Sequence, residues 1–343
     1  MMKQYIEKII NGTDLTVEEM IEATEACFHP DVTNTEISAF LTALRMKGET
    51  ASEISGLAEV IRAQSAIQPE GLSNIMDNCG TGGDRSNSFN ISTTAAFVIA
   101  GAGIPVAKHG NRSISSKTGS ADVLEHLGVS LTFTAEEVEE ILTENNIVFL
   151  YAPHIHAKLK HFMQVRQELG LPTIMNVIGP LTNPVELDAQ LLGVYRRDML
   201  TVLTESLKKL GRRRAVVING AEYMDEASLA GENHLTLLEN DEITSFTLHP
   251  EEVGLPVYPN EAIRGGTPKE NAEILLDVLN AKPGAYLDTV LLNAGIALFA
   301  SGKAQSIQEG VNLARESIVS GAALEQLEKL VQYSKKQLAQ AKN

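Results

Sequence analysis

The sequence contains no tryptophan and few other aromatic residues. Aromatics make up 5% of the 343 residues, too few to favour a protein that stacks single-stranded nucleic acid on aromatic side chains. Positive charge is also scarce, because 28 Lys and Arg stand against 44 Asp and Glu, for a net charge of −16. Such a chain repels a nucleic-acid backbone over most of its surface. An anionic substrate would therefore have to bind in a local positive patch.

Cysteines and long apolar runs are scarce too. The two cysteines, Cys27 and Cys79, cannot form a disulfide framework, which favours a reducing compartment. The longest apolar runs, residues 95–107 and 290–300, are too short or too broken by Gly and Pro to span a bilayer. Charges near the N-terminus occupy the place where a signal peptide needs an apolar core. We therefore expect a cytoplasmic protein that does not bind membranes.

The chain is long enough for one large and one small domain. Its first part, residues 1–68, predicts a small all-helical domain with three helices, each starting at a capping box. The capping pairs are Thr16 with Glu19, Thr33 with Glu36, and Thr50 with Glu53.

The remainder, residues 69–343, alternates between apolar runs typical of buried strands and helical segments. Strands are expected at 75–78, 147–151 and 215–218, and helices at 93–102 and 120–127. This alternation predicts a larger α/β domain with a central mixed or parallel sheet flanked by helices. The segment 159–182 is helix-like at its start, and we expect part of it to pack on the helical domain.

Two loops rich in glycine and hydroxyl groups lie within residues 79–120. The first is Gly80-Thr81-Gly82-Gly83-Asp84, followed by Asn90-Ile91-Ser92-Thr93; the second starts at Lys108-His109-Gly110-Asn111-Arg112-Ser113. Glycines let the backbone approach a ligand, and free N–H groups at a helix start attract anions. Two such cradles predict a ligand with phosphate at both ends.

The first loop matches neither common nucleotide-binding motif. Arg85 stands where a dinucleotide fingerprint needs glycine, and no Gly-Lys-Ser/Thr follows. Nor do the residues suggest covalent or hydrolytic catalysis. The adjacent Asp225 and Glu226 read as a solvated turn unless phosphates lie nearby, in which case Mg²⁺ would suit them.

Several arginines and histidines outside the two loops are further candidates for binding. Arg166 is a natural partner for a substrate carboxylate. The run 212–214, three arginines, is expected to form a solvated strand edge. His154, His156 and His161 cluster in sequence, but without a fourth ligand at suitable spacing they do not predict zinc.

Several segments in the same order resemble the anthranilate phosphoribosyltransferases, which share the nucleoside phosphorylase-like fold. They include EISAFLTALRMKGET, both glycine loops, YAPHIHAKLKHFMQVRQELGLPTIMNVIGPLTNP, IRGGTPKENA and VLLNAGIALF. The resemblance implies transfer of phosphoribosyl from phosphoribosyl pyrophosphate (PRPP) to the amine of anthranilate, a step of tryptophan biosynthesis. It also implies Mg²⁺, with two ions, and a homodimer formed through the helical domain.

The resemblance assigns roles to matching positions. The residues implied for PRPP are Gly80, Gly83, Asp84, Ser88, Asn90, Ile91, Ser92, Thr93, Lys108, His109, Gly110, Asn111, Arg112, Ser113, Ile114, Ser115, Ser116 and Ser120. Those implied for anthranilate are Gly80, Asn111 and Arg166, and those for the metal are Ser92, Asp225 and Glu226. His109 is a weak candidate for assisting deprotonation of the amine, so no catalytic base is assigned.

Two positions depart from the family pattern. Asn219 stands where the family usually has histidine, and Tyr223 where it usually has glycine, so the metal loop could be shaped differently. Two alternatives stay open: a pyrimidine nucleoside phosphorylase-like enzyme on the same fold, and a non-catalytic paralogue that binds nucleic acid.

Overall fold

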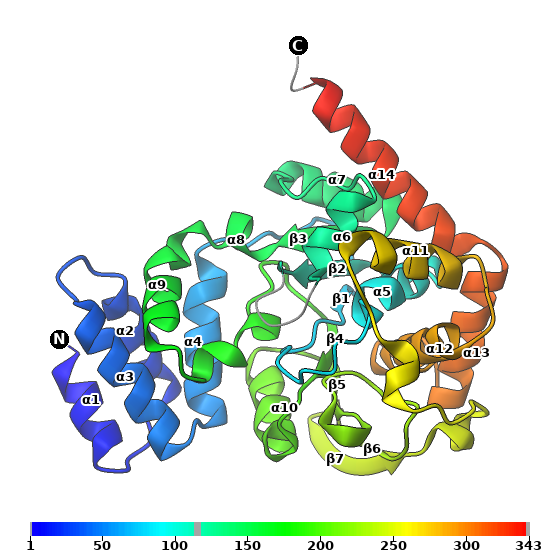
Figure 1. The fold of residues 1–343 in the computed structure, drawn as a ribbon. Helices are drawn as coiled ribbons and strands as arrows, with labels where there is room; N and C mark the ends of the chain where they lie inside the picture. Colours follow the sequence, from blue (N-terminus) through cyan, green and yellow to red (C-terminus); the bar gives the residue numbers. More distant parts are fainter. Residues whose placement is uncertain (1, 113–117, 341–343) are drawn as a thin grey trace.

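A bundle of helices lies beside a larger unit built on one seven-stranded sheet (Figure 1). The computed structural model describes residues 2–112 and 118–340. This arrangement confirms the predicted fold class, a small helical unit with a larger α/β unit. Within the described residues, no helix combines the length and apolar character needed to cross a bilayer.

The helical bundle contains four helices before residue 68, rather than the three predicted. They are α1 (Lys3–Ile10), α2 (Val17–Cys27), α3 (Asn34–Lys47) and α4 (Ala51–Ala63). The three predicted capping boxes are present at the starts of α2, α3 and α4. The first helix was missed because its N-cap, Met2, makes no side-chain hydrogen bond. Burial of Tyr5 and Ile9 stabilises α1 instead.

A helix from much later in the chain packs on this bundle. Helix α9 (Lys160–Leu169) lies against α3, and its buried Phe162 stacks on Phe28 with ring centroids 5.2 Å apart. The segment 159–182 thus adds side chains to the apolar core of the bundle. The exact domain boundaries remain a prediction.

The sheet has the strand order β3-β2-β1-β4-β5-β6-β7. Strands β1 (Met76–Asp77), β2 (Val106–Gly110), β3 (Ile147–Tyr151), β4 (Ala189–Gly193) and β5 (Arg214–Asn219) are parallel. Strands β6 (Asn233–Glu239) and β7 (Glu242–Leu248) extend it antiparallel. The chain order reverses between β1 and β4, and in such sheets ligands bind beyond the carboxyl ends of the strands at that point.

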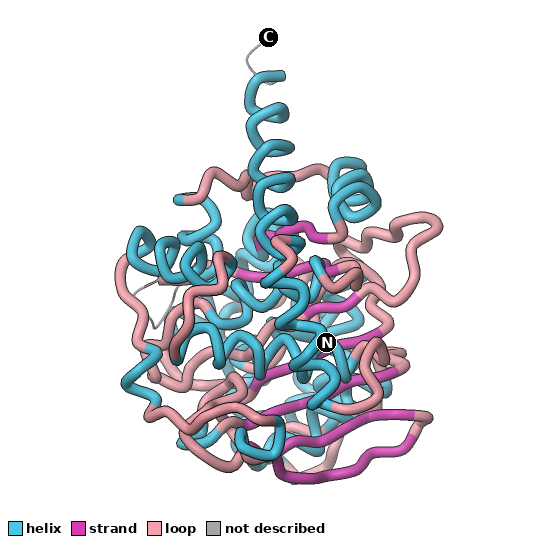
Figure 2. Tube along the Cα trace, turned by 90° about the vertical axis from the view of Figure 1, so that its right-hand side faces the viewer, coloured by secondary structure: helices cyan, strands magenta, loops and turns pink. Residues whose placement is uncertain are grey.

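Helices cover both faces of the sheet (Figure 2). They are α5 (Ile91–Gly101), α6 (Ser120–His126), α7 (Ala135–Asn145), α8 (Ala152–Ile155), α10 (Leu200–Lys209), α11 (Pro268–Leu279), α12 (Ala285–Ala300), α13 (Ile307–Val319) and α14 (Ala322–Gln340). Helix α5 is apolar on nearly every side because β2, α12, α13 and α14 surround it. Its N-terminus is thereby fixed at the carboxyl edge of the sheet.

The run of three arginines is not the solvated edge that we expected. Arg212 is 4% exposed, and its Nε donates to Oε1 of Gln190 at 3.1 Å. Arg214 is also buried, and its guanidinium donates to the carbonyls of Phe299 and Ala300. Only the middle arginine, Arg213, is exposed, because successive side chains of an extended segment point in opposite directions.

Candidate active site

The first glycine loop follows β1 and touches the ends of two other strands. The amide of Thr81 donates to the carbonyl of Gly193 at 2.8 Å, and the amide of Gly82 donates to Oδ2 of Asp225 at 2.5 Å. A side chain at Gly80 would lie 2.8 Å from that same carboxylate, so only glycine fits. The loop and the predicted metal pair therefore lie at one site.

Asp225 and Glu226 are half-buried at this site and do not lie on a fully solvated turn. An oxygen of Glu226 accepts from the amide of Ser92, at the start of α5, at 3.2 Å. Burial raises the pKa of Glu226 to about 7, opposed by the positive charge of Lys108. Burial and the negative charge of Asp84 raise the pKa of Asp225 well above its ordinary value. Three carboxylates thus share a site in which Lys108 only partly offsets their negative charge.

This donor set suits a divalent cation that also binds phosphate oxygens. Oδ2 of Asp84 is buried without a hydrogen-bond partner. Among the described side chains, however, no group of three or more His, Cys, Asp or Glu is arranged to hold a metal alone. Mg²⁺ characteristically takes one or two carboxylates and completes its shell with phosphate oxygens and water. The site fits Mg²⁺ brought together with a phosphorylated ligand.

The start of α5 faces the same space. Asn90 precedes the helix, but its side chain does not cap it. Instead its Nδ2 donates to the carbonyl of Thr118 at 3.3 Å, which leaves the helix end to other anions. The hydroxyl of Thr93 is buried without a partner, and the hydroxyl of Ser88 accepts from that of Ser86. Ile91 is the buried first residue of the helix.

Residues 264–271 complete this wall and were not among the predicted site residues. Asn271 donates from Nδ2 to Oδ1 of Asn90 at 2.7 Å, and its own Oδ1 accepts from the amide of Gly266 at 2.6 Å. The hydroxyl of Thr118 donates to the carbonyl of Gly266. The signal in the sequence was Gly265-Gly266 directly before the capping box of α11. Nothing in the sequence, however, indicated which loop this turn would meet.

The second loop begins inside the sheet. Lys108 is 3% exposed, and its charge lowers the pKa values of Asp77 and Glu226 from what burial alone would give. Gly110 has no room for a side chain, because an added carbon would lie 2.4 Å from Oγ of Ser120. That hydroxyl donates to the carbonyl of Asn111 at 3.1 Å. The loop is thus closed on the start of α6.

His109 is a buried, neutral imidazole. Its Nδ1 lies 3.1 Å from the carbonyl of Gly179, which can only accept, so Nδ1 carries the proton. Burial, together with the nearby imidazole of His156, lowers the pKa of His109 to about 3. Its Nε2 is therefore a bare acceptor, and it has no hydrogen-bond partner. This ring can orient an N–H group but holds a proton poorly at neutral pH.

Arg112, which the sequence predicted to contact PRPP, already has partners within the protein. Arg112 forms ion pairs with Asp122 at 2.7 Å and Glu125 at 2.9 Å, on α6. Its charge is thus partly used within the protein. The predicted residues Ser113, Ile114, Ser115 and Ser116 lie outside the described residues.

Arg166 lies on α9, the helix that packs against α3 of the bundle. Its side chain is half-buried, desolvation lowers its pKa, and among the described residues no hydrogen bond or ion pair involves it. A half-buried cation without a partner indicates a binding site for a ligand carboxylate. Of the nearby histidines, His154 is exposed, His156 is buried against Ser65, and the side chain of His161 lies outside the description.

The two unusual residues, Asn219 and Tyr223, share one partner. Arg197 donates from Nε to Oδ1 of Asn219 at 2.8 Å, and its guanidinium lies 4.7 Å from the ring centroid of Tyr223. Tyr223 and Glu222 have φ of 64° and 59°, the left-handed region that favours glycine. The cation–π contact thus helps to hold a strained turn directly before Asp225.

Comparisons with known proteins agree with this geometry. The glycosyl transferase family models match residues 3–65 with the helical bundle domain and residues 72–324 with the a/b domain. The anthranilate phosphoribosyltransferase of Oceanobacillus iheyensis is 58% identical over 335 residues, covering 98% of each chain.

Solved structures are similar over nearly the whole chain. The anthranilate phosphoribosyltransferase from Thermus thermophilus has a TM-score of 0.89 at 39% identity and covers 96% of this chain and 99% of its own. The enzyme from Saccharomyces cerevisiae in complex with PRPP and Mg has a TM-score of 0.88 at 29% identity, with 98% of both chains covered.

Proposed function

Because the chain belongs to the anthranilate phosphoribosyltransferase family of glycosyltransferases, we propose that it transfers the 5-phosphoribosyl group of PRPP to anthranilate in tryptophan biosynthesis. The amine nitrogen bonds to C1 of the ribose, the bond from C1 to pyrophosphate breaks, and the amine loses a proton. The products are N-(5-phosphoribosyl)anthranilate and pyrophosphate. The main support is a pair of hydrogen bonds. The amide of Gly82 donates to Asp225 and the amide of Ser92 donates to Glu226, so the predicted phosphate-binding loop lies against the carboxylate pair.

PRPP lies between the two glycine loops in this proposal. The first loop and the start of α5 hold the pyrophosphate end through backbone N–H groups and hydroxyls. Lys108 and the second loop hold the ribose-phosphate end. The residues assigned to PRPP in the sequence keep this role as proposals, including those that the structure does not describe.

Asp225 and Glu226, with the hydroxyl of Ser92, would hold Mg²⁺, and we propose two ions. When bound, Mg²⁺ neutralises the charge that builds on the departing pyrophosphate. The support is the half-buried cluster of Asp84, Asp225 and Glu226, where burial and then mutual repulsion raise the pKa values of the last two. The ribose carbon becomes oxocarbenium-like as the bond to oxygen lengthens, so positioning and electrostatics supply most of the acceleration.

Anthranilate is placed by one cation and two polar groups. We propose that Arg166 binds its carboxylate, since this half-buried guanidinium lacks a protein partner. Asn111 and Gly80 are proposed to contact the same ligand. The bare Nε2 of His109 would accept from the amine N–H and orient the nitrogen lone pair toward C1. With a pKa of about 3, His109 is an orienting acceptor in this mechanism, not the base that retains the proton.

A homodimer through the helical bundle is also proposed. Ile10 on α1 is 70% exposed and Met46 on α3 is 83% exposed, and a second bundle would cover both. Light scattering should give twice the chain mass for the native protein, and Met46→Lys should shift it toward the monomer. A monomeric native protein would refute the dimer.

Two parallel reactions test the function against its nearest alternative. The protein should release pyrophosphate from PRPP and Mg²⁺ only when anthranilate is present. It should release no thymine from thymidine and inorganic phosphate. Phosphorolysis of thymidine without anthranilate-dependent pyrophosphate release would favour the nucleoside phosphorylase alternative. A gel shift tests the remaining alternative, and we expect none with DNA or RNA at physiological salt, given the net charge of −16.

A further inference from the structure

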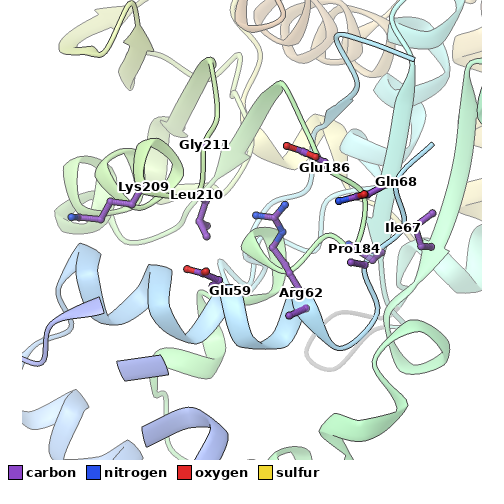
Figure 3. Close-up of a pocket in the computed structure, with 11 residues that line it drawn as sticks. Glu59, Arg62, Ile67, Gln68, Pro184, Glu186, Lys209, Leu210 and Gly211 are labelled. Atoms are coloured by element: carbon purple, nitrogen blue, oxygen red, sulfur yellow. The ribbon is translucent and has the colours of Figure 1, made fainter. Parts of the chain in front are cut away.

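A cavity of about 420 Å³ lies where the helical bundle meets the sheet (Figure 3). Its walls come from α4, from the connection after it, from residues 184–186 and from the turn after α10. These segments precede β1, β4 and β5, so the cavity is at the amino edge of the sheet. The proposed active site lies beyond the carboxyl ends of the same strands. The cavity is therefore a separate site.

The two connecting segments that form its floor are fixed to each other. The amide of Ile67 donates to the carbonyl of Pro184 at 2.9 Å, and Ile67 pairs with Val185 in a parallel bridge. These backbone contacts hold in place the two segments that form one wall of the cavity. Its volume lies in the range of small-molecule sites.

Charged groups of both signs line this cavity. Arg62 points from α4 into the space below Glu186 (Figure 3), and Glu59 lies one turn earlier on the same helix. Within the described part of the chain, none of the three has a hydrogen bond or an ion pair through its side chain. Nε of Arg62 is buried without a partner. Burial lowers the pKa of Arg62, and the charges of the exposed Glu186 and Glu59 only partly oppose this effect. The unsatisfied donor on Arg62 is typical of a site that a ligand carboxylate completes.

A second guanidinium adds to the positive side. Arg212 follows the wall residues Leu210 and Gly211, is 4% exposed, and has a buried Nη2 without a partner. The positive charge of Arg62 is among the causes that lower the pKa of Arg212. A negative group at Arg62 would therefore also relieve the repulsion between the two arginines.

The two signs of charge decide the class of ligand. A simple anion at Arg62 would face the carboxylates of Glu59 and Glu186, and a simple cation would face two arginines. A zwitterion meets both demands. The remaining wall includes Ile67, Pro184 and Leu210, which suit an apolar side chain. We propose that this cavity binds a free α-amino acid with an apolar side chain, its carboxylate on Arg62 and its ammonium group on Glu186.

Binding here would join the helical bundle to the sheet, because Arg62 belongs to one and Glu186 leads into the other. A ligand that binds only the folded protein raises its melting temperature with concentration. The probes are L-leucine, 4-methylpentanoate and 3-methylbutylamine, which share one alkyl chain and differ in charged groups. We expect L-leucine to raise the melting temperature of the full chain saturably, and the other two to leave it unchanged at about 10 mM.

Variants separate this site from a general solvent effect. Arg62→Gln and Glu186→Gln should each weaken the response to L-leucine at least about tenfold, the loss of one charged contact. Lys208→Gln is the matched control, since Lys208 is an exposed residue of α10 that does not line the cavity, and its response should equal that of the native protein. Transferase activity without L-leucine should be unchanged in all three, which shows that they fold.

Three results would overturn the proposal. One is the absence of any response of the native protein to L-leucine. Another is an equal response to 4-methylpentanoate, which would mean that only an anion is recognised. The third is an undiminished response in both cavity variants. None of these outcomes bears on the proposed transfer reaction, because the cavity residues do not touch that site.

Discussion

Polar atoms that are removed from water and lack protein partners indicate which residues bind ligands. Nε2 of His109 and Oδ2 of Asp84 are buried, the guanidinium of Arg166 is half-buried, and no hydrogen bond involves any of them in the described structure. Such atoms cost free energy in the empty protein. They identify, at single-residue scale, where the carboxylate, the amine and the metal of the proposed reaction would bind.

Arg166→Ala should impair the use of anthranilate far more than the use of PRPP. Loss of one charge-assisted contact to a carboxylate predicts a rise in the KM for anthranilate of on the order of 10- to 100-fold. Steady-state kinetics with each substrate varied in turn measure both constants. Gln164→Ala, an exposed change on the same helix, should alter neither. Equal effects of Arg166→Ala on both substrates would contradict its placement.

His156 should weaken the fold at acid pH. Burial lowers its folded pKa to about 4, below its ordinary value of 6.5. The unfolded chain therefore binds more protons between these values, and stability falls as pH drops through this window. At pH 5 the loss is on the order of 2 kcal/mol relative to pH 8.

Urea unfolding of the native protein and of His156→Gln over pH 5 to 8 tests this effect. The glutamine variant keeps a neutral polar side chain, so its stability should fall less toward pH 5. Parallel pH profiles of the two proteins would show that the imidazole does not titrate as described.

At the scale of elements, the turn between β5 and the predicted metal pair is strained at two consecutive residues, Glu222 and Tyr223. Tyr223 replaces the glycine that the family pattern usually has there, and it keeps the left-handed backbone. The sequence predicted that this loop could be shaped differently, but it did not predict the contacts that stabilise the strained turn. Those contacts depend on Arg197, which lies on the segment after β4, a strand that the sequence analysis did not predict.

Tyr223→Gly and Tyr223→Ala separate strain from side-chain contact. Both lose the cation–π contact with Arg197, but only alanine retains the strained backbone. The glycine variant should therefore be more stable than the alanine variant by roughly 1 kcal/mol, the reverse of their usual order. Denaturant unfolding measures the difference. An alanine variant as stable as the glycine variant would mean that the turn carries no strain.

Helices were predicted correctly where a capping box marks their first residue. Three capping boxes identified three helices, while α1 was missed because it lacks one. The strand β4 was missed because its second residue, Gln190, is polar in the sequence. In the fold, Gln190 is buried between the carbonyl of Pro180 and the side chain of Arg212. Only the packed partners show that a buried strand can hold this residue.

At the scale of the whole molecule, topology assembles the site from distant segments. The glycine loops follow neighbouring strands, so the sequence could predict both of them and their common ligand chemistry. The contact between Asn90 and Asn271 joins residues 181 positions apart, and no local pattern indicates it. The same holds for the cavity at the opposite edge of the sheet, whose walls meet only when the two units pack.

The consumption of anthranilate by the purified chain tests the central claim most directly. Anthranilate is fluorescent, and attachment of the phosphoribosyl group quenches this signal. With Mg²⁺ and excess PRPP, the signal should decay to completion, and it should stay constant when PRPP is omitted. A constant signal with PRPP present, at enzyme concentrations equal to that of anthranilate, would contradict the assignment.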